Sequence, residues 1–164
     1  MRRTFAVGLI MLTLLSGCAV DSESVRIGAL PLCDHPNTGR LLLMAQSVPS
    51  ASLIPCIEQL PEGWQLEHVD VESGQSRLQF DNPVGDDVRL FLLPGCSPAG
   101  SPMAAGNGVD TYVTTDGSLR IDEHVFDGGC IRLEVPASGD AVRMADAIGW
   151  VTRDWLRQES DWEL

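Results

Sequence analysis

The chain has 164 residues and a formal net charge of −12, because 23 acidic residues oppose 11 basic ones, all of them arginine. A chain of this length accommodates one domain with its own hydrophobic core. Its acidic surface would repel phosphate backbones, which excludes nucleic acid as an expected partner.

The N-terminus has the composition of a bacterial export signal. Arg2 and Arg3 precede the uncharged apolar run Phe5–Leu15. As a helix this run rises about 16 Å, far short of the roughly 30 Å hydrocarbon core of a membrane. We therefore interpret residues 1–17 as a secretory leader that takes no part in the fold. The paired arginines leave general and twin-arginine export both open.

The end of this leader, Leu15–Cys18 (LSGC), resembles the lipobox of bacterial lipoproteins. The resemblance implies that the sulfur of Cys18 is acylated and that the leader is cleaved just before it. The alternative is an ordinary secreted protein with a cysteine near its cleavage site. Acyl chains would anchor the acidic protein to the lipid bilayer, at the outer face of the cytoplasmic membrane. Residues 18–38 would then form a tether.

Four more cysteines follow Cys18, and an even number in an exported chain indicates a disulfide framework. Three connectivities are possible for them. We favour Cys33–Cys56, which would tie the N-terminal arm to the domain, together with Cys96–Cys130, which would cross-link one sheet. Zinc binding is the alternative, but no two of these cysteines lie two to four residues apart. We expect no metal and no cofactor.

The predicted domain, residues 39–158, begins with the apolar segment Arg40–Ser47, which suits a short helix or a buried strand. Leu66–Glu72 and Gln75–Asp81 then alternate with period two on either side of a Ser-Gly turn. This pattern predicts a β-hairpin, and the apolar run Val88–Leu93 predicts a central strand after it.

The Ser-Gly turn also predicts the register of the hairpin. Asp70 is expected opposite Arg77 on the outer face. Four apolar residues are expected to share the inner face: Val69, Val71, Leu78 and Phe80.

A second hairpin is predicted from Asp110–Thr115 and Ser118–Phe126, which flank an Asp-Gly pair. A turn made by that pair would set Tyr112 opposite Ile121. A further turn at two glycines leads into the strand Ile131–Val135.

Residues 140–158 are predicted to form one amphipathic helix, because apolar residues recur on one helical face. These residues are Ala141, Met144, Ala145, Ile148, Val151 and Trp155. The predicted fold class is therefore α+β: an antiparallel meander sheet of about six strands with a C-terminal helix packed across it. Residues 159–164 are predicted to form a C-terminal tail.

Two segments resemble parts of uncharacterised exported and membrane-associated proteins of actinobacteria. They are Ala45–Trp64 (AQSVPSASLIPCIEQLPEGW) and His124–Cys130 (HVFDGGC). Those proteins carry an SxPC…LPxGW block and a later FxGGC block. The resemblance implies an exported location and a cysteine pattern; because the family has no established activity, it implies no catalytic residues.

The sequence contains no nucleophile elbow, zinc-protease helix or phosphate-binding loop, so we do not expect an enzyme. His68 and His124 are predicted to lie on outward, solvated faces of strands, where His124 would alternate with Arg120 and Asp122. The acidic segment Asp81–Asp87 is interpreted as a hairpin tip, although a weak calcium site there is the alternative.

Trp150 is the most suggestive residue for binding. It lies on the polar face of the predicted helix, near Arg143 and Arg153. A solvent-facing indole bracketed by arginine is typical of a partner-binding hot spot, so Trp150 and Arg153 are candidate partner-binding residues. The alternative is that one of the arginines merely stacks on the indole.

These inferences predict a monomeric, membrane-anchored lipoprotein with a non-enzymatic binding or accessory role in the cell envelope. Its partners would be the bilayer and an unknown envelope component. Two alternatives remain open: a carrier of a small lipid or glycan, and an envelope hydrolase.

Overall fold

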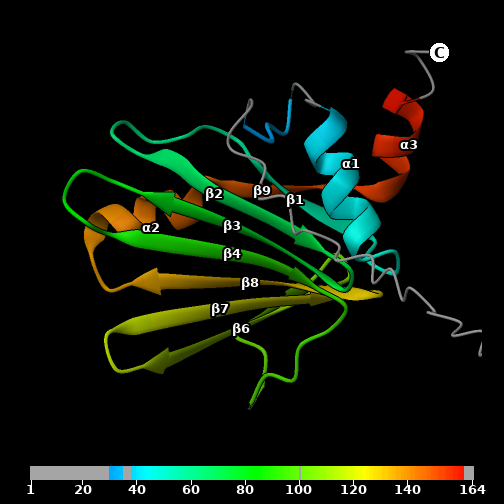
Figure 1. Ribbon diagram of the computed structural model, residues 1–164. Coiled ribbons are helices and arrows are strands. Elements are labelled where there is room, and N and C mark those ends of the chain that lie inside the picture. Colours follow the sequence, from blue (N-terminus) through cyan, green and yellow to red (C-terminus); the bar gives the residue numbers. More distant parts are fainter. Residues whose placement is uncertain (1–29, 35–37, 100, 161–164) are drawn as a thin grey trace, which may run out of the picture.

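The computed structural model describes residues 30–34, 38–99 and 101–160 (Figure 1). The predicted leader and Cys18 lie outside the described residues. The elements are α1 (Thr38–Ser47), β1 (Leu53–Ile57), β2 (Gln65–Glu72), β3 (Gln75–Asp81), β4 (Asp87–Leu93), β5 (Ala104–Gly106), β6 (Val109–Asp116), β7 (Leu119–Phe126), β8 (Gly129–Pro136), α2 (Gly139–Asp146), β9 (Ile148–Thr152) and α3 (Arg153–Ser160). The predicted α+β fold class is confirmed.

Seven strands form one antiparallel sheet in the order β2-β3-β4-β8-β7-β6-β5. After β4 the chain crosses to the far edge, where β5 begins a meander that returns until β8 pairs with β4. The sequence predicted about six strands for this sheet, and the strand it missed is β5. This edge strand has only three residues and lies among small residues that show no alternation.

The inner face of this sheet is covered by the second sheet, a β1–β9 pair, and by the helices (Figure 1). Helices α1 and α3 contact each other at one end of the large sheet, and α2 packs on β8 and β4. The core lies between these layers. Its largest fully buried side chains include Phe80, Leu41, Met44, Ile54, Leu78, Leu90, Ile131 and Met144.

The first hairpin has the predicted register, with Asp70 opposite Arg77 and Val69 opposite Leu78. Gly74 in its turn has a φ of +94°, a conformation that favours glycine. Val71 shares the inner face with Val69 as predicted, but the residue is 39% exposed. Val71 lies near the end of β2, an edge strand whose only partner among the described strands is β3.

The second hairpin forms, but its predicted register is wrong by two residues. Tyr112 lies opposite Glu123, and Asp116 itself pairs with Leu119. The turn therefore begins one residue later, at Gly117, whose φ is +61°. Glycine is favoured at the first position of such a turn. A shift of two residues leaves each side chain on its predicted face, because strands have a period of two.

The prediction of a single helix over residues 140–158 is wrong, because this segment forms α2, β9 and α3. Ser138 caps α2 by accepting a hydrogen bond from the backbone N–H of Ala141 (3.1 Å). Beyond α2, Gly149 and the β-branched residues of β9 are weak helix formers, and pairing with β1 favours a strand. A Cβ atom on Gly149 would lie 2.8 Å from Oε1 of Glu58, so a larger residue there would displace the end of the Glu58 side chain.

Both predicted disulfides are present. Cys33–Cys56 fixes residues 30–34 against β1, where Leu32 also bridges to Ile57, so this part of the predicted tether belongs to the domain. Cys96–Cys130 joins the segment after β4 to the start of β8. The favoured connectivity is therefore confirmed.

Candidate functional site

A cleft of about 220 Å³ lies on the inner face of the sheet, between β7–β8 and the elements α2 and β9. Alternate residues of a strand point to the same face. Arg120, Asp122 and His124 of β7 therefore project together into the cleft. The neighbouring strand β8 adds Ile131 and Leu133, which lie opposite His124 and Asp122. The cleft thus combines charged and aliphatic walls.

Arg120 and Asp122 form a bidentate ion pair. The Nε and Nη2 atoms of Arg120 donate to the two carboxylate oxygens of Asp122, at 2.7 and 2.6 Å. The Asp122 residue is only 5% exposed, and this hydrogen bonding is the main cause that raises the pKa of Arg120 above its usual value. Asp146, at the end of α2, raises it further. Such a two-point pair holds both side chains in a fixed orientation.

His124 is half-buried and contacts two other elements. Its Nδ1 atom lies 3.0 Å from the hydroxyl of Thr111 on β6, and its ring lies against that of Trp150 on β9. Burial lowers the pKa of His124, with Asp122 acting in the opposite direction and Arg120 in the same one. The imidazole is therefore neutral at pH 7, since the ordinary value is already about 6.5.

The prediction of an outward, solvated His124 is wrong. Polar residues that alternate along a strand usually face solvent, and here they face the covered side of the sheet. The apolar residues Ile121 and Val125 occupy the opposite, outer face instead. The Arg-x-Asp-x-His spacing on β7 was the one pattern in the sequence that could have indicated this cleft. Asp146 also lines the cleft, and it was not among the candidate residues predicted from the sequence.

The structure gives Trp150 and Arg153 different surroundings. Trp150 lies on β9 opposite Pro55, is 41% exposed and contacts His124 rather than an arginine. The guanidinium of Arg153 donates instead to three backbone carbonyls, those of Ala45, Val48 and Ala51, each at 2.7 Å. Arg153 therefore fixes the C-terminal end of α1, whereas Trp150 is available to a ligand.

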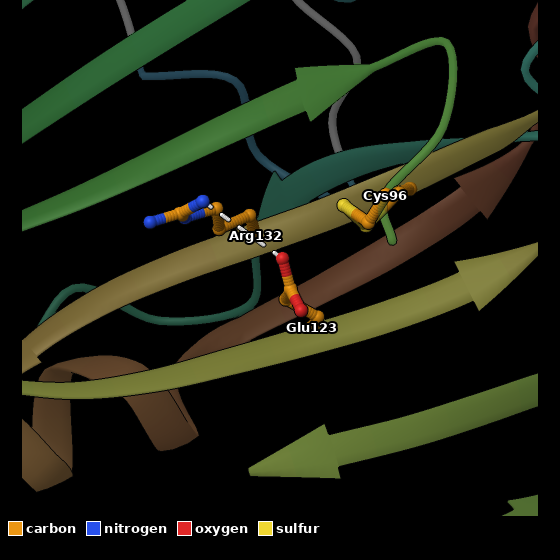
Figure 2. Close-up of a disulfide and its surroundings, with 4 residues drawn as sticks. Cys96, Glu123 and Arg132 are labelled. Atoms are coloured by element: carbon orange, nitrogen blue, oxygen red, sulfur yellow. Dashed lines mark ion pairs between the residues drawn. A yellow bond between two sulfur atoms is a disulfide. The ribbon is translucent and has the colours of Figure 1, made fainter. Parts of the chain in front are cut away.

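The outer face of the sheet carries paired charges. Arg132 on β8 lies 3.2 Å from Glu134 and 3.9 Å from Glu123 on β7, close to the Cys96–Cys130 disulfide (Figure 2). Partly exposed ion pairs of this kind contribute little stability. They give this face a mixed charge.

His68 lies on the same outer face, opposite Gln79 as predicted. Its Nε2 atom is 2.6 Å from a carboxylate oxygen of Asp70, which also pairs with Arg77. The strands thus place His68 and His124 on opposite faces of the sheet, and only His124 lines the cleft.

The acidic tip at Asp81–Asp87 is held by protein hydrogen bonds. The side-chain oxygen of Asn82 accepts from the backbone N–H groups of Val84 and Asp86, and the Asp86 carboxylate accepts from Ser138 (2.8 Å). Within the described residues, no three His, Cys, Asp or Glu side chains are grouped closely enough to hold a metal ion. These hydrogen bonds hold the turn, while one carboxylate oxygen of Asp81 and one of Asp87 are buried without a hydrogen-bond partner.

Comparisons with protein-family models, with curated proteins and with solved structures find no match to this chain. Among the described helices, none is long and apolar enough to cross a membrane. The two disulfides indicate an oxidising, extracytoplasmic environment.

Proposed function

We propose that the protein is a bacterial cell-envelope lipoprotein whose domain is a non-enzymatic binding or accessory module. Acyl chains on Cys18 would hold it at the outer face of the cytoplasmic membrane. This location is supported by the leader-like N-terminus, by the lipobox resemblance of Leu15–Cys18 and by the two disulfides. The acidic domain would contribute no attraction to anionic lipid, so anchoring depends on the acyl chains.

The observation that carries the binding role is the Arg120–Asp122 pair beside the partly exposed indole of Trp150. Both charged side chains are held in place by each other before any ligand arrives. Pre-organised polar groups on a partly apolar wall are typical of small-ligand sites. The arrangement is suited to orienting a ligand through hydrogen bonds.

Of the two kinds of carrier considered, the cleft favours the glycan over the lipid. Its volume of about 220 Å³ and its charged walls provide little room for an apolar acyl chain. A sugar, in contrast, offers hydroxyl groups to the charged side chains.

The anchoring proposal is tested by the intact mass of the protein extracted from membranes. The expected mass is that of the chain from Cys18 onward with its acyl groups and two disulfides. A Cys18→Ala variant should keep its leader and carry no lipid. The matched control Cys33→Ala should still be acylated, although it loses one disulfide. Cleavage of the Cys18→Ala variant at the same bond would contradict lipoprotein processing.

The non-enzymatic role is tested with the purified protein on a panel of ester, peptide and glycoside substrates. We expect no turnover by the wild type. Hydrolysis that disappears in a His124→Ala variant would favour the envelope hydrolase instead. His68→Ala is the matched control, because His68 lies on the outer face of the sheet.

A further inference from the structure

The cleft on the inner face carries an excess of negative charge. Arg120 and Asp122 neutralise each other through their bidentate pair, and His124 is neutral at pH 7. The carboxylate of Asp146 remains, within a protein whose formal net charge is −12. An anionic ligand such as a phosphate or a uronic acid would therefore be repelled.

The size of the cleft limits the ligand to a small molecule. Its volume of about 220 Å³ falls below the roughly 300–1,000 Å³ of sites that bind drug-sized ligands. One six-membered ring with its substituents is a suitable size. A longer molecule would have to extend out of the cleft, which is open to solvent.

The walls offer two kinds of contact. Trp150 presents a partly exposed indole, next to the aliphatic side chain of Ile148. On the facing strand, Arg120 has five N–H donors, of which Asp122 accepts two, so the guanidinium has donors to spare. Asp146 adds a carboxylate that can accept hydrogen bonds.

A sugar ring matches both kinds of contact. Its axial C–H groups form an apolar face that stacks on an aromatic ring, and its hydroxyl groups donate to carboxylates and accept from guanidinium groups. We propose that this cleft binds one neutral sugar ring, the terminal unit of an envelope glycan, stacked on Trp150 with its hydroxyls on Arg120 and Asp146. This inference rests on the proposed binding function and names its ligand class.

Saturation-transfer NMR on the protein extracted in a polyoxyethylene detergent, which has no sugar headgroup, tests this site. The probes are N-acetylglucosamine and the methyl glycosides of glucose, galactose, mannose and arabinose. At least one should bind saturably, with a Kd on the order of 1 mM, as expected for a small open site. Trp150→Ala should weaken that binding by at least about tenfold, because it removes the stacking surface.

Two neighbouring carboxylates provide a matched control. Asp122→Asn should weaken binding by releasing Arg120, whereas Glu123→Gln, on the outer face of the same strand, should leave binding unchanged. Asp146→Asn is a second test should Asp122→Asn fail to fold. Equal weakening by Glu123→Gln and by the cleft variants would overturn the site.

Three further outcomes would overturn the sugar site. In the first, the protein binds none of the sugar probes. In the second, Trp150→Ala binds the sugar as tightly as the wild type does. In the third, the protein binds choline or glucuronate more tightly than any neutral sugar. Choline would indicate a small organic cation held by Asp146 and Trp150. Each of these results leaves the acylation of Cys18 untouched, because the intact mass reports that modification separately.

Discussion

The imidazole ring of His124 lies against the indole ring of Trp150, with the ring centroids 5.3 Å apart and the ring planes tilted by 50°. This contact joins β7 of the large sheet to β9 of the small one. It also covers part of the imidazole, whose burial lowers the pKa of His124. The protonation state of one histidine is therefore linked to the packing of the two sheets.

The first prediction is that protonation of His124 destabilises the folded protein. Because the pKa of His124 is lowered by folding, the unfolded chain binds the proton more tightly. Well above pH 6.5, His124 is neutral in both the folded and the unfolded chain and does not change the free energy of unfolding. As the pH falls from 6.5 toward the lower pKa of the folded state, His124 should lower the free energy of unfolding progressively. Urea unfolding from pH 8 to pH 5 should show a shallower decline for His124→Gln than for the wild type.

NMR titration of the histidine ring protons measures the same effect directly. The His124 resonance should titrate with a pKa below the ordinary histidine value of about 6.5. A His124 pKa at or above that value, or equal slopes for wild type and His124→Gln, would contradict the prediction.

The register of the first hairpin could be predicted near its turn because its determinants there are local, whereas the register shift between Leu66 and His68 was not predicted. The Ser-Gly turn and the alternation around it fix which residues pair, and Asp70 does lie opposite Arg77. The register of the second hairpin failed because Gly117, and not Asp116, occupies the first position of the turn. Two adjacent residues both suit turns there, and pattern alone does not choose between them.

The C-terminal segment and the cleft depended on contacts between distant parts of the chain. The residues of β9 have helical periodicity, but their backbone pairs with Leu53–Ile57, far away in the sequence. Whether Arg120 and Asp122 face solvent or a cleft depends on what covers that side of the sheet. Strand periodicity places residues on one face but does not say which face is covered. The sequence did single out Trp150. Its contact with His124 could not be predicted, because the sequence does not show which face of β7 is covered by β9.

The second prediction concerns the end of α1. Arg153→Lys should lower the free energy of unfolding by about 2 kcal/mol, because one ammonium group cannot reproduce the three hydrogen bonds of the guanidinium fork. Chemical denaturation measures this change. Arg143→Lys, on the exposed side of α2, is the control and should change stability by less than about 0.5 kcal/mol, because its ion pair with Asp140 is exposed. Similar losses in the two variants would show that the carbonyl contacts contribute little.

The third prediction concerns the turn between β7 and β8. A Cβ atom on Gly128 would lie 1.8 Å from the carbonyl oxygen of Ser50, and its φ of +72° already disfavours other residues. Gly128→Ala should therefore cost more than about 3 kcal/mol or prevent folding. Gly117→Ala also changes a glycine of positive φ, +61°, but a Cβ there meets no atom within 4 Å.

The comparison of these two glycine variants separates backbone strain from the steric clash. We expect Gly117→Ala to cost about 1–2 kcal/mol, the typical cost of a positive φ for a residue that carries a Cβ atom. If thermal unfolding showed the same loss of stability for Gly128→Ala and Gly117→Ala, the predicted clash between a Cβ atom at residue 128 and Ser50 would be contradicted.

The fourth prediction separates the two disulfides by where each restrains the chain. Thiol counting on the purified protein should find no free thiol at the four paired cysteines. Removing either pair by double Cys→Ala substitution should cost about 3–4 kcal/mol, because each bridge closes a loop of similar length. Global stability therefore cannot tell the bridges apart.

Limited proteolysis can distinguish them, because the bridges hold different segments. Loss of Cys96–Cys130 should release residues 94–99 after β4 and increase cleavage there, whereas loss of Cys33–Cys56 should release residues 30–34 from β1. Cleavage sites mapped by mass spectrometry should thus differ between the two variants under conditions where both remain folded. Identical cleavage patterns would mean that other contacts, such as the pairing of Leu93 with Cys130, hold these segments without the bridges.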